Sequence, residues 1–385
     1  MLIAAHHSMI RSKPYLCELE YLESTGTQYI DTDEKIYDDT AVTVTMYSDY
    51  STENATYFFG SDSSTERFYF REYQGKASYS TGGWWQNTSI SIVGTHTVTM
   101  TNNSVTVDGV SSSRAGNSKT GAGKLLLLTA GTYGMTASGV RIYSCKIWQN
   151  GILVRDMIPV RDLRGKPCMY DRVSGKLFYN AGTGSFTAGP EIHPVEYIES
   201  TGTEYIDTGF IPGLNFHIEV RGRKAGDYSV NAAIFSNEGV NSYVDCYYNA
   251  GWGMRCYGNG MARQIYDGWF DAGIDFDFTS SPTTTFHMNS EEETATTSKT
   301  EAQITGSTKS VRLFQGMYGK TNPVDIVFFN ADKSGQPALR LIAVRVGTDA
   351  TSWEGAMMDT LTRRVYRNDG TGAFTYGNDT SWPTA

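Results

Sequence analysis

Two aromatic pairs are the residues of this chain best suited to binding chemistry. Gly83-Trp84-Trp85 and Gly268-Trp269-Phe270 lie 185 residues apart (269 − 84). Neighbouring residues of a strand point to opposite faces of the sheet. We therefore expect one ring of each pair in the core and the other on the surface, where it could stack on the C–H face of a sugar. The alternative is that a loop covers the sheet and buries both rings.

A further exposed aromatic candidate is Trp252, which stands in the turn sequence Gly-Trp-Gly. Together, Trp84, Trp85, Trp252, Trp269 and Phe270 are the predicted glycan-binding residues.

The acidic residues do not suggest catalysis. A retaining glycosidase needs two carboxyl groups about 5 Å apart, and alternate positions such as Asp275 and Asp277 would supply them. No third acid is in register with this pair, which a polar strand face explains better. Asp31 and Asp207 each follow Tyr-Ile, where an Asp commonly bonds turn backbone groups. The chain has no Gly-x-Ser-x-Gly sequence. We predict no enzyme, no catalytic residue and no cofactor.

The sequence contains a long repeat. Residues 20–32 read EYLESTGTQYIDT and residues 196–208 read EYIESTGTEYIDT, with 11 of 13 positions identical and an offset of 176 (196 − 20). A second pair, residues 180–187 and 368–375, has an offset of 188 (368 − 180). Such offsets fit a duplicated domain rather than a short structural repeat.

Short strand patterns fill both copies. Residues 41–47 (AVTVTMY) alternate apolar and hydroxyl side chains, which is typical of a half-buried strand. Asn150-Gly151 is a strong hairpin signal. The continuous apolar run enclosed by Lys124 and Thr129 predicts a central strand buried on both faces. Many short strands separated by Gly, Asn and Asp turns predict an all-β protein with two tandem antiparallel β-sandwich domains.

The predicted organisation has four parts. Residues 1–18 lack periodicity and form an N-terminal arm, and residues 19–189 form the first sandwich. Residues 190–194 contain Pro190 and Pro194 and read as a stiff linker. Residues 195–385 form the second sandwich with a C-terminal tail.

Composition excludes several partners. The net charge is −9, and the densest Lys/Arg cluster is the short stretch 362–367, so we predict no nucleic-acid binding. The longest aliphatic run, residues 125–128, is far shorter than the ~20 apolar residues of a membrane span. The first seven residues lack the features of a secretory signal. Either a signal has been removed, or the protein leaves its cell by another route, such as lysis.

The five cysteines form neither a disulfide framework nor a metal motif. Only Cys246 and Cys256 could face each other, across a hairpin, and we interpret all five chiefly as small core residues. Adjacent His6 and His7 have no further ligand nearby. Calcium at a sandwich rim would need a dense run of Asp and Asn, and the nearest approach is Asn368-Asp-Gly. We predict no metal.

Three stretches of the first copy resemble a known kind of module: residues 21–32, 150–161 and 170–186. They are similar to concanavalin A-like, LamG-type jelly-roll modules in fibre and other structural proteins of tailed phages of gut bacteria. Similar modules occur in secreted and surface proteins of those bacteria. The resemblance covers nearly all of residues 19–189 and, less fully, 195–377. It implies a jelly-roll sandwich twice over.

The resemblance implies a virion structural protein at the particle surface. The arm would attach it to other virion proteins, and the sandwiches would adhere to host-surface glycan. Whether it forms homo-oligomers is left open. The alternative is a secreted or cell-surface carbohydrate-binding protein of a gut bacterium, which an export signal upstream of Met1 would favour.

Overall fold

The structure is a computed structural model of the 385-residue chain. It describes residues 13–49, 55–62, 66–131, 138–224, 232–237, 244–249, 253–256, 261–263, 269–278, 283–289, 291–296, 308–315, 324–333, 335, 337–348 and 352–377. These residues form strands and turns and contain no helix. The chain divides into two compact units, which are described separately: residues 1–105 with 112–189, and residues 190–385 with the short segment 106–111.

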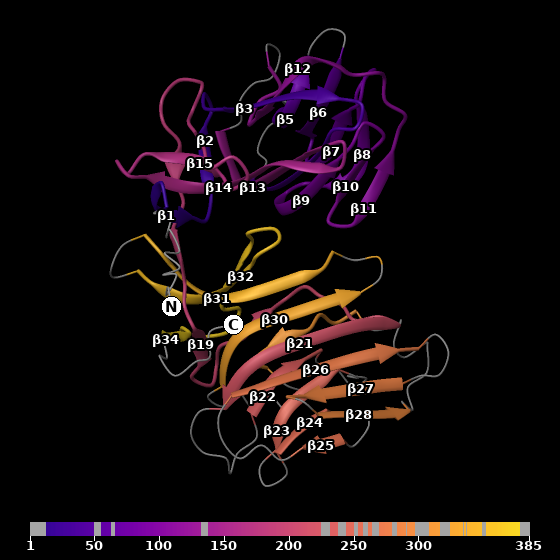
Figure 1. The fold of residues 1–385 in the computed structure, drawn as a ribbon, viewed down its shortest axis with the longest axis vertical. Coiled ribbons are helices and arrows are strands. Elements are labelled where there is room, and N and C mark those ends of the chain that lie inside the picture. The colour runs from indigo at the N-terminus through magenta and orange to yellow at the C-terminus, as the bar shows by residue number, and fades with distance from the viewer. Residues whose placement is uncertain are drawn as a thin grey trace, which may run out of the picture. The chain divides into compact units, whose positions relative to one another are not determined.

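The first unit contains a long antiparallel sheet (Figure 1). From one side to the other, the main strands are β15 (Pro167–Asp171), β14 (Ile152–Asp162), β13 (Ser138–Gln149), β4 (Ala41–Ser48), β9 (Gly94–Met100), β10 (Ser104–Val107) and β11 (Val110–Ser113). Shorter strands extend it: β1 (Tyr15–Leu19), β2 (Leu22–Thr25), β16 (Leu177–Phe178) and β17 (Thr187–Ala188).

The second sheet of this unit has six strands. Their order is β3 (Ile30–Tyr37), β12 (Thr120–Leu127), β5 (Thr56–Asp62), β6 (Arg67–Tyr73), β7 (Lys76–Ser80) and β8 (Gln86–Ser91). Leu126 in β12 is only half-buried, because its side chain alternates with those of Leu125 and Leu127. The prediction that this strand is buried on both faces was therefore wrong.

The second unit repeats this succession of pairings. Its long sheet has β32 (Glu354–Asp359), β31 (Leu339–Gly347), β30 (Val324–Lys333), β21 (Asn215–Lys224), β26 (Trp269–Asp277), β27 (Thr283–Met288) and β28 (Glu291–Thr296), with short strands β18 (Glu191–Pro194), β19 (Tyr197–Ser200), β33 (Val365–Tyr366) and β34 (Thr375–Gly377). The other sheet has β20 (Ile206–Asp207), β29 (Arg312–Leu313), β22 (Ala232–Ser236), β23 (Asp245–Asn249), β24 (Gly253–Cys256) and β25 (Met261–Arg263).

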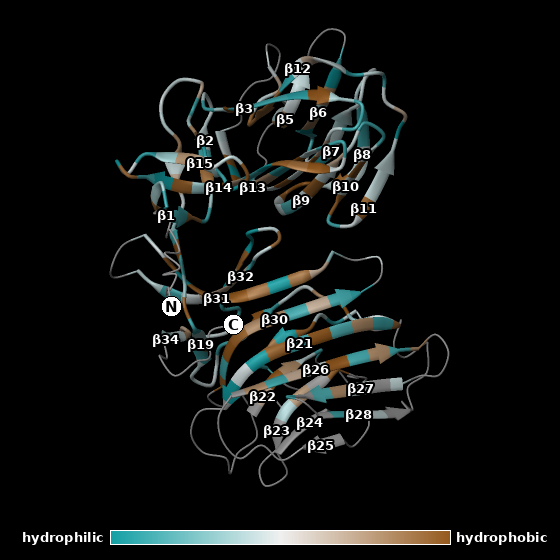
Figure 2. Ribbon diagram, in the orientation of Figure 1, coloured by the Kyte–Doolittle hydropathy of each residue, from teal (hydrophilic) through white to brown (hydrophobic). Residues whose placement is uncertain are grey.

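Alternation places the core between the sheets. In β4, Val42, Val44 and Met46 are fully buried, whereas Thr43 hydrogen-bonds Thr99 across the strands through its hydroxyl group (2.9 Å). The strand predicted at residues 41–47 is thus confirmed. In the second unit one apolar cluster contains residues of both sheets, and Phe235 contacts Phe329 with ring centroids 6.2 Å apart. Figure 2 shows the hydrophobic segments along β21, β26 and β31.

The predicted hairpin at Asn150-Gly151 joins β13 to β14. Both residues have positive φ, 51° and 72°. These are the values that a type I′ turn requires, and Asn and Gly reach them at low cost.

The repeated sequence 20–32 forms a turn that is wrapped around one side chain. Gln28 is buried, and its Oε1 accepts hydrogen bonds from the Thr25 backbone N–H (2.7 Å) and the Ser24 hydroxyl (3.2 Å). Its Nε2 donates to Thr25 Oγ1 (2.9 Å) and to the Thr183 carbonyl (3.2 Å). Each polar group of this amide therefore has a protein partner.

Glu204 occupies the same position in the second unit. Its carboxylate accepts hydrogen bonds from the backbone N–H groups of Thr201 (2.8 Å) and Thr203 (3.2 Å) and from the Thr201 hydroxyl (2.9 Å). Burial would raise the pKa of Glu204, but the hydrogen bonds from Thr201 and the neighbouring backbone groups lower it to about 2.

The second repeated sequence closes on the first. Asn180 Oδ1 accepts from the backbone N–H of Tyr29 (3.1 Å), and Asn368 Oδ1 accepts from that of Tyr205 (3.1 Å). Gly182 leaves no room for a side chain, because a Cβ atom would lie 2.0 Å from the Thr27 carbonyl oxygen. The two repeats of each copy therefore form one structure, which we call the clasp: residues 24–32 with 180–184, and residues 200–208 with 368–372.

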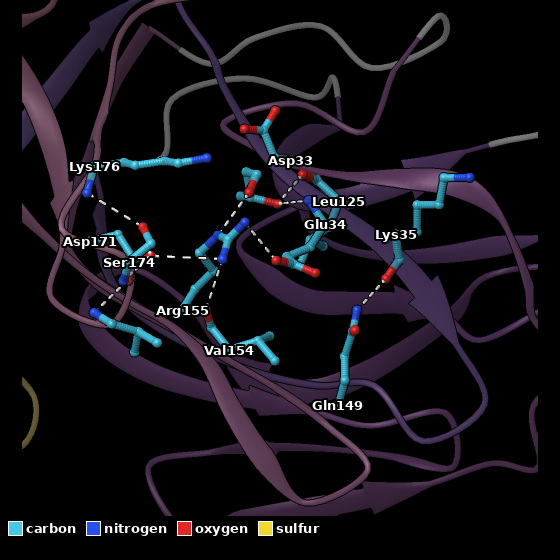
Figure 3. Close-up of polar contacts among 12 residues, drawn as sticks. Asp33, Glu34, Lys35, Leu125, Gln149, Val154, Arg155, Asp171, Ser174 and Lys176 are labelled. Carbon is cyan, nitrogen blue, oxygen red and sulfur yellow. Dashed lines mark hydrogen bonds and ion pairs between the residues drawn. The ribbon is translucent and has the colours of Figure 1, made fainter.

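In the first unit an arginine forms further ion pairs and hydrogen bonds beside the clasp, shown in Figure 3. Arg155 of β14 lies between Glu34 (2.7 Å) and Asp171 (3.8 Å) and donates from Nε to the Thr32 carbonyl (3.1 Å). Burial and the nearby Asp171 raise the pKa of Glu34, while the Arg155 charge acts in the opposite direction. The register places Leu339 at the position of Arg155 in the second unit, since Met157 pairs with Asp171 as Leu341 pairs with Asp359.

Two predicted boundaries were wrong. Residues 15–18 of the predicted arm belong to β1, where Tyr15 and Cys17 are buried against β14. Residues 191–194 of the predicted linker form β18, which pairs with β31 as β1 pairs with β14. In both places a buried residue alternates with exposed or half-buried ones, and a stretch of four or five residues is too short for this pattern to be recognised. Residues 1–12, including His6 and His7, lie outside the described residues.

The register pairs Cys246 with Cys256, as the hairpin prediction required. Cys246 is nevertheless a free, buried thiol, as are Cys17, Cys145 and Cys168. The side chain of Cys256 lies outside the described part. No helix long and apolar enough to cross a membrane occurs among the residues that the structure describes.

The clasp predicts a pH dependence that differs between the units. The pKa of Glu204 is lower in the folded chain than its usual value of about 4.5. Its stabilisation is therefore complete above that pH and is lost as the pH falls towards 2, by at most ~3 kcal/mol. Glu204→Gln should reduce the loss of unfolding free energy between pH 7 and pH 2.5, measured by urea denaturation. Gln28→Glu should increase it. An identical pH dependence in wild type and both variants would contradict this account.

Candidate functional site

The first aromatic pair is exposed. Trp84 and Trp85 are 72% and 43% accessible, and their ring centroids lie 5.6 Å apart at an interplanar angle of 78°. Both belong to the loop between β7 and β8, residues 81–85, which we call the tryptophan loop. The expectation that one ring enters the core was wrong for this pair, because strand alternation does not apply in a loop.

The second pair differs. Phe270 is 3% accessible and belongs to β26, which pairs with β21 as β9 pairs with β4. The two pairs therefore do not occupy equivalent places, and the prediction of equivalence was wrong. Equivalent residues of the two units in this region are 186 positions apart (313 − 127), not the 185 that separates the aromatic pairs, since Leu127 pairs with Ile30 as Leu313 pairs with Ile206. The side chain of Trp269 and the whole of Trp252 lie outside the described residues.

A buried lysine fixes the tryptophan loop. The Lys119 ammonium group donates to the Thr81 carbonyl (2.8 Å), to Asn102 Oδ1 (3.1 Å) and to the Asn117 carbonyl (2.6 Å). Burial lowers the pKa of Lys119, while the charges of Asp38 and Glu66 raise it. An ammonium group with three oxygen acceptors is satisfied without a directly contacting carboxylate.

Further hydrogen bonds hold the loop backbone. Asn117 donates from Nδ2 to the Gly82 carbonyl (2.9 Å), and Arg114 donates to the Trp84 carbonyl. The Ser80 hydroxyl donates to the Gly83 carbonyl (3.0 Å). With its backbone held at four successive residues, the loop presents the two rings in one arrangement. A preorganised surface loses less conformational entropy when a ligand binds.

Arg71 lies beside these rings in β6. This residue is 6% accessible, and its guanidinium carbon lies 4.6 Å from the Trp85 ring centroid. The rings of Tyr57, Tyr69 and Tyr73 also surround it, at 5.7, 5.7 and 5.5 Å. The register places Arg71 between Tyr57 of β5 and Ser78 of β7. We call Arg71 with Tyr57, Tyr73, Trp84 and Trp85 the aromatic–arginine surface.

The aromatic–arginine surface combines two kinds of contact. Exposed rings offer flat apolar faces, and a guanidinium group offers several N–H donors with a fixed geometry. Sugars present C–H faces and polar substituents side by side, so they match both. Sequence reasoning found the tryptophans but not Arg71, because it is 14 residues from Trp85 and on a different strand.

The recurring aspartates bond backbone groups two residues on, as predicted, although Asp31 lies within β3 and Asp207 ends β20. Asp31 accepts a hydrogen bond from the Asp33 backbone N–H (3.0 Å) and pairs with Lys124 (2.6 Å). Asp207 accepts one from the Gly209 backbone N–H (3.0 Å).

A polar cluster that sequence reasoning missed lies on the long sheet of the second unit. Asp275 accepts hydrogen bonds from His217 Nδ1 (2.6 Å) and from His287 Nε2, and His287 Nδ1 lies 3.0 Å from Glu292. Burial raises the pKa of Asp275, but the two histidines outweigh it and lower that pKa. The cross-strand register could have revealed this cluster, since His217 pairs with Asp275.

His217 and Asp275 also line an open pocket with Phe216, Phe276 and Lys333. Within the described ranges, no three His, Cys, Asp or Glu side chains are arranged to hold a metal ion.

Comparison with known proteins adds little. No family model matches the chain, and no curated protein matches it. One similar solved structure is that of domains LG4-5 of the mouse laminin alpha1 chain. It is 12% identical, and the alignment covers 95% of this chain and 97% of that one with a TM-score of 0.27. That score is too low to carry an argument. The strand pairings themselves define the protein as all-β, with antiparallel sheets arranged as sandwiches.

The lysine anchor is open to a direct test. Lys119→Met removes a buried ammonium group together with its three hydrogen bonds. It should lower the free energy of unfolding by about 1–3 kcal/mol. The matched control is Lys124→Met, because the exposed Lys124 forms its ion pair with Asp31 within the described part of the chain, and it should lower the free energy of unfolding less than Lys119→Met does. Urea denaturation measures both. Equal effects of the two substitutions would show that Lys119 does not anchor the loop.

Proposed function

We propose that the chain is a structural protein of a tailed-phage particle that displays two copies of one lectin-like sandwich. The first copy binds host-surface glycan through the aromatic–arginine surface, and the protein acts by binding, without catalysing a reaction. The observation that carries the binding proposal is the exposure of Trp84 and Trp85 on a hydrogen-bonded loop. Large exposed aromatic rings on a rigid support are typical of binding sites.

The phage assignment rests on the resemblance of residues 21–32, 150–161 and 170–186 to modules of phage structural proteins. It places the protein at the virion surface, with other virion proteins as partners and no partner among nucleic acids or membranes. The residues before β1 provide the attachment.

The binding proposal predicts a separation between adhesion and stability. Trp84→Ala should weaken adhesion to host cells or to an array of bacterial polysaccharides about tenfold or more, as expected for a truncated binding tryptophan. The melting temperature should hardly change, because the ring is exposed. Ile152→Ala is the matched control: Ile152 is an exposed apolar residue of the same unit, in β14, which belongs to the other sheet from β7 and β8. Unchanged adhesion of Trp84→Ala would refute glycan binding at this surface.

The attachment proposal predicts different effects for two deletions. Removal of residues 1–12 should leave the chain folded but prevent its incorporation into particles. Removal of residues 1–18 should also destabilise the first unit, because Tyr15 and Cys17 are buried in β1. Immunoblots of purified particles and thermal unfolding of the purified protein measure the two effects. Normal incorporation of the shorter deletion would place the attachment site on a sandwich surface instead.

A further inference from the structure

Arg71 is the feature of the aromatic–arginine surface that stacking alone does not use. Its Nε donates to the Ser78 hydroxyl (3.2 Å) and its Nη1 to the Tyr57 hydroxyl (3.4 Å). Its Nη2 has no hydrogen-bond partner in the part of the chain that the structure describes. This atom is also absent from the fully buried polar atoms that lack partners, so it reaches solvent. The guanidinium group thus keeps N–H donors free at the edge of the tryptophan loop.

The charge of Arg71 also lacks a direct counterion. No acidic side chain among the described residues forms an ion pair with it. The adjacent Glu72 accepts a hydrogen bond from the Gly75 backbone N–H (2.6 Å), and burial raises the pKa of Glu72 although the Arg71 charge lowers it. Glu66 is bonded to the backbone N–H groups of Thr120 (2.9 Å) and Ala122 (3.1 Å). Neither acid is therefore placed to neutralise the free edge of the guanidinium group.

The surrounding rings compensate this charge only in part. Four aromatic rings lie within 6 Å of the guanidinium carbon, and their faces attract a cation. Hydrogen bonds to the remaining N–H groups are a separate requirement, which ring faces do not meet. A carboxylate meets it best, because its two oxygens match the planar donors of arginine and because the pair forms next to apolar rings, where screening is weak.

We propose, on the basis of the glycan binding proposed above, that the bound sugar carries a carboxylate and that Arg71 binds it. A pyranose ring stacks on the exposed tryptophans, and its carboxylate turns towards Nη2 of Arg71. The ligand class is therefore an acidic polysaccharide containing uronic or similar acids. The contact is ionic and hydrogen-bonded, and no covalent step is involved.

The test compares acidic polymers with their neutral counterparts. The probes are polygalacturonate and alginate, each before and after chemical reduction of its carboxyl groups, with the full-length protein and binding measured by calorimetry. The wild-type protein should bind the acidic form of at least one polymer about tenfold or more tightly than the reduced form. Equal affinity for the two forms would overturn the carboxylate assignment. Equally tight binding of a polysaccharide that carries sulfate groups in place of carboxylates would also overturn it, since binding would then require only negative charge.

Two variants separate Arg71 from the stacking rings. Arg71→Met should abolish the preference, so that the acidic and reduced forms bind with equal affinity, whereas Trp84→Ala should weaken the binding of both forms and keep the preference. Arg71→Lys keeps the charge without the planar donors and should retain only part of the preference. Because Arg71→Lys keeps a cation among the rings, it still tests the proposal if Arg71→Met proves unstable in thermal unfolding.

The outcomes for the two proposals are distinguishable. Binding of neutral polymers that Trp84→Ala weakens, with no preference for the acidic form, would leave glycan binding standing and refute the carboxylate. If Arg71→Met weakens acidic and reduced polymers equally, Arg71 only supports Trp85, and the inference is wrong. Absence of binding to every polymer would count against both proposals.

Discussion

The clasp that joins the beginning and the end of each unit is the interaction on which the rest of the structure depends. In the first unit it links Gln28 to Thr183, residues that are 155 positions apart, and in the second the Thr203 hydroxyl donates to Thr371, 168 positions away. Closing a loop of this length costs conformational entropy, which local turns do not offset. The clasp combines several hydrogen bonds at one place, and the Gln28 and Glu204 side chains at its centre are buried, so losing their partners would leave a buried polar group unsatisfied. This explains why both repeated sequences are so alike while the strands between them have diverged.

The same contact can be kept by different residues in the two units. Arg141 of β13 lies over the Tyr21 ring at 4.5 Å and pairs with Glu23 at 2.6 Å. In the second unit Arg223 lies over the Tyr197 ring at 5.5 Å, but this arginine comes from β21 and pairs with Asp325. Because Arg141 and Asp325 occupy the same register position, the positive charge has moved one strand along. A cation beside the tyrosine is therefore retained without retention of the residue that supplies it.

The sequence predicted what short-range chemistry determines. Period-two alternation identified β4, and the Asn150-Gly151 pair identified a hairpin. The position of Asp31 after Tyr-Ile identified an aspartate that bonds the backbone two residues on. The sequence-based prediction failed where the structure around a residue depends on a partner that is distant in the chain. β1 and β18 are strands because β14 and β31 offer them an edge. Trp84 and Trp85 are both exposed because Lys119, Asn117 and Arg114 hold their loop away from the sheet. The Asp275 cluster and Arg71 likewise exist only through pairing across strands.

These dependencies also distinguish the two units at the proposed binding surface. The register places Tyr247 at the position of Arg71 and Arg255 at that of Ser78, since Tyr247 pairs with Arg255 as Arg71 pairs with Ser78. The connection that corresponds to the tryptophan loop, residues 257–260, reads Tyr-Gly-Asn-Gly and contains no tryptophan. The clasp, which carries the fold, is the same in both units, whereas the residues that would carry binding differ. A module whose closure is fixed in this way can change its loops without losing its sheets, so one copy can bind while the other serves a different contact.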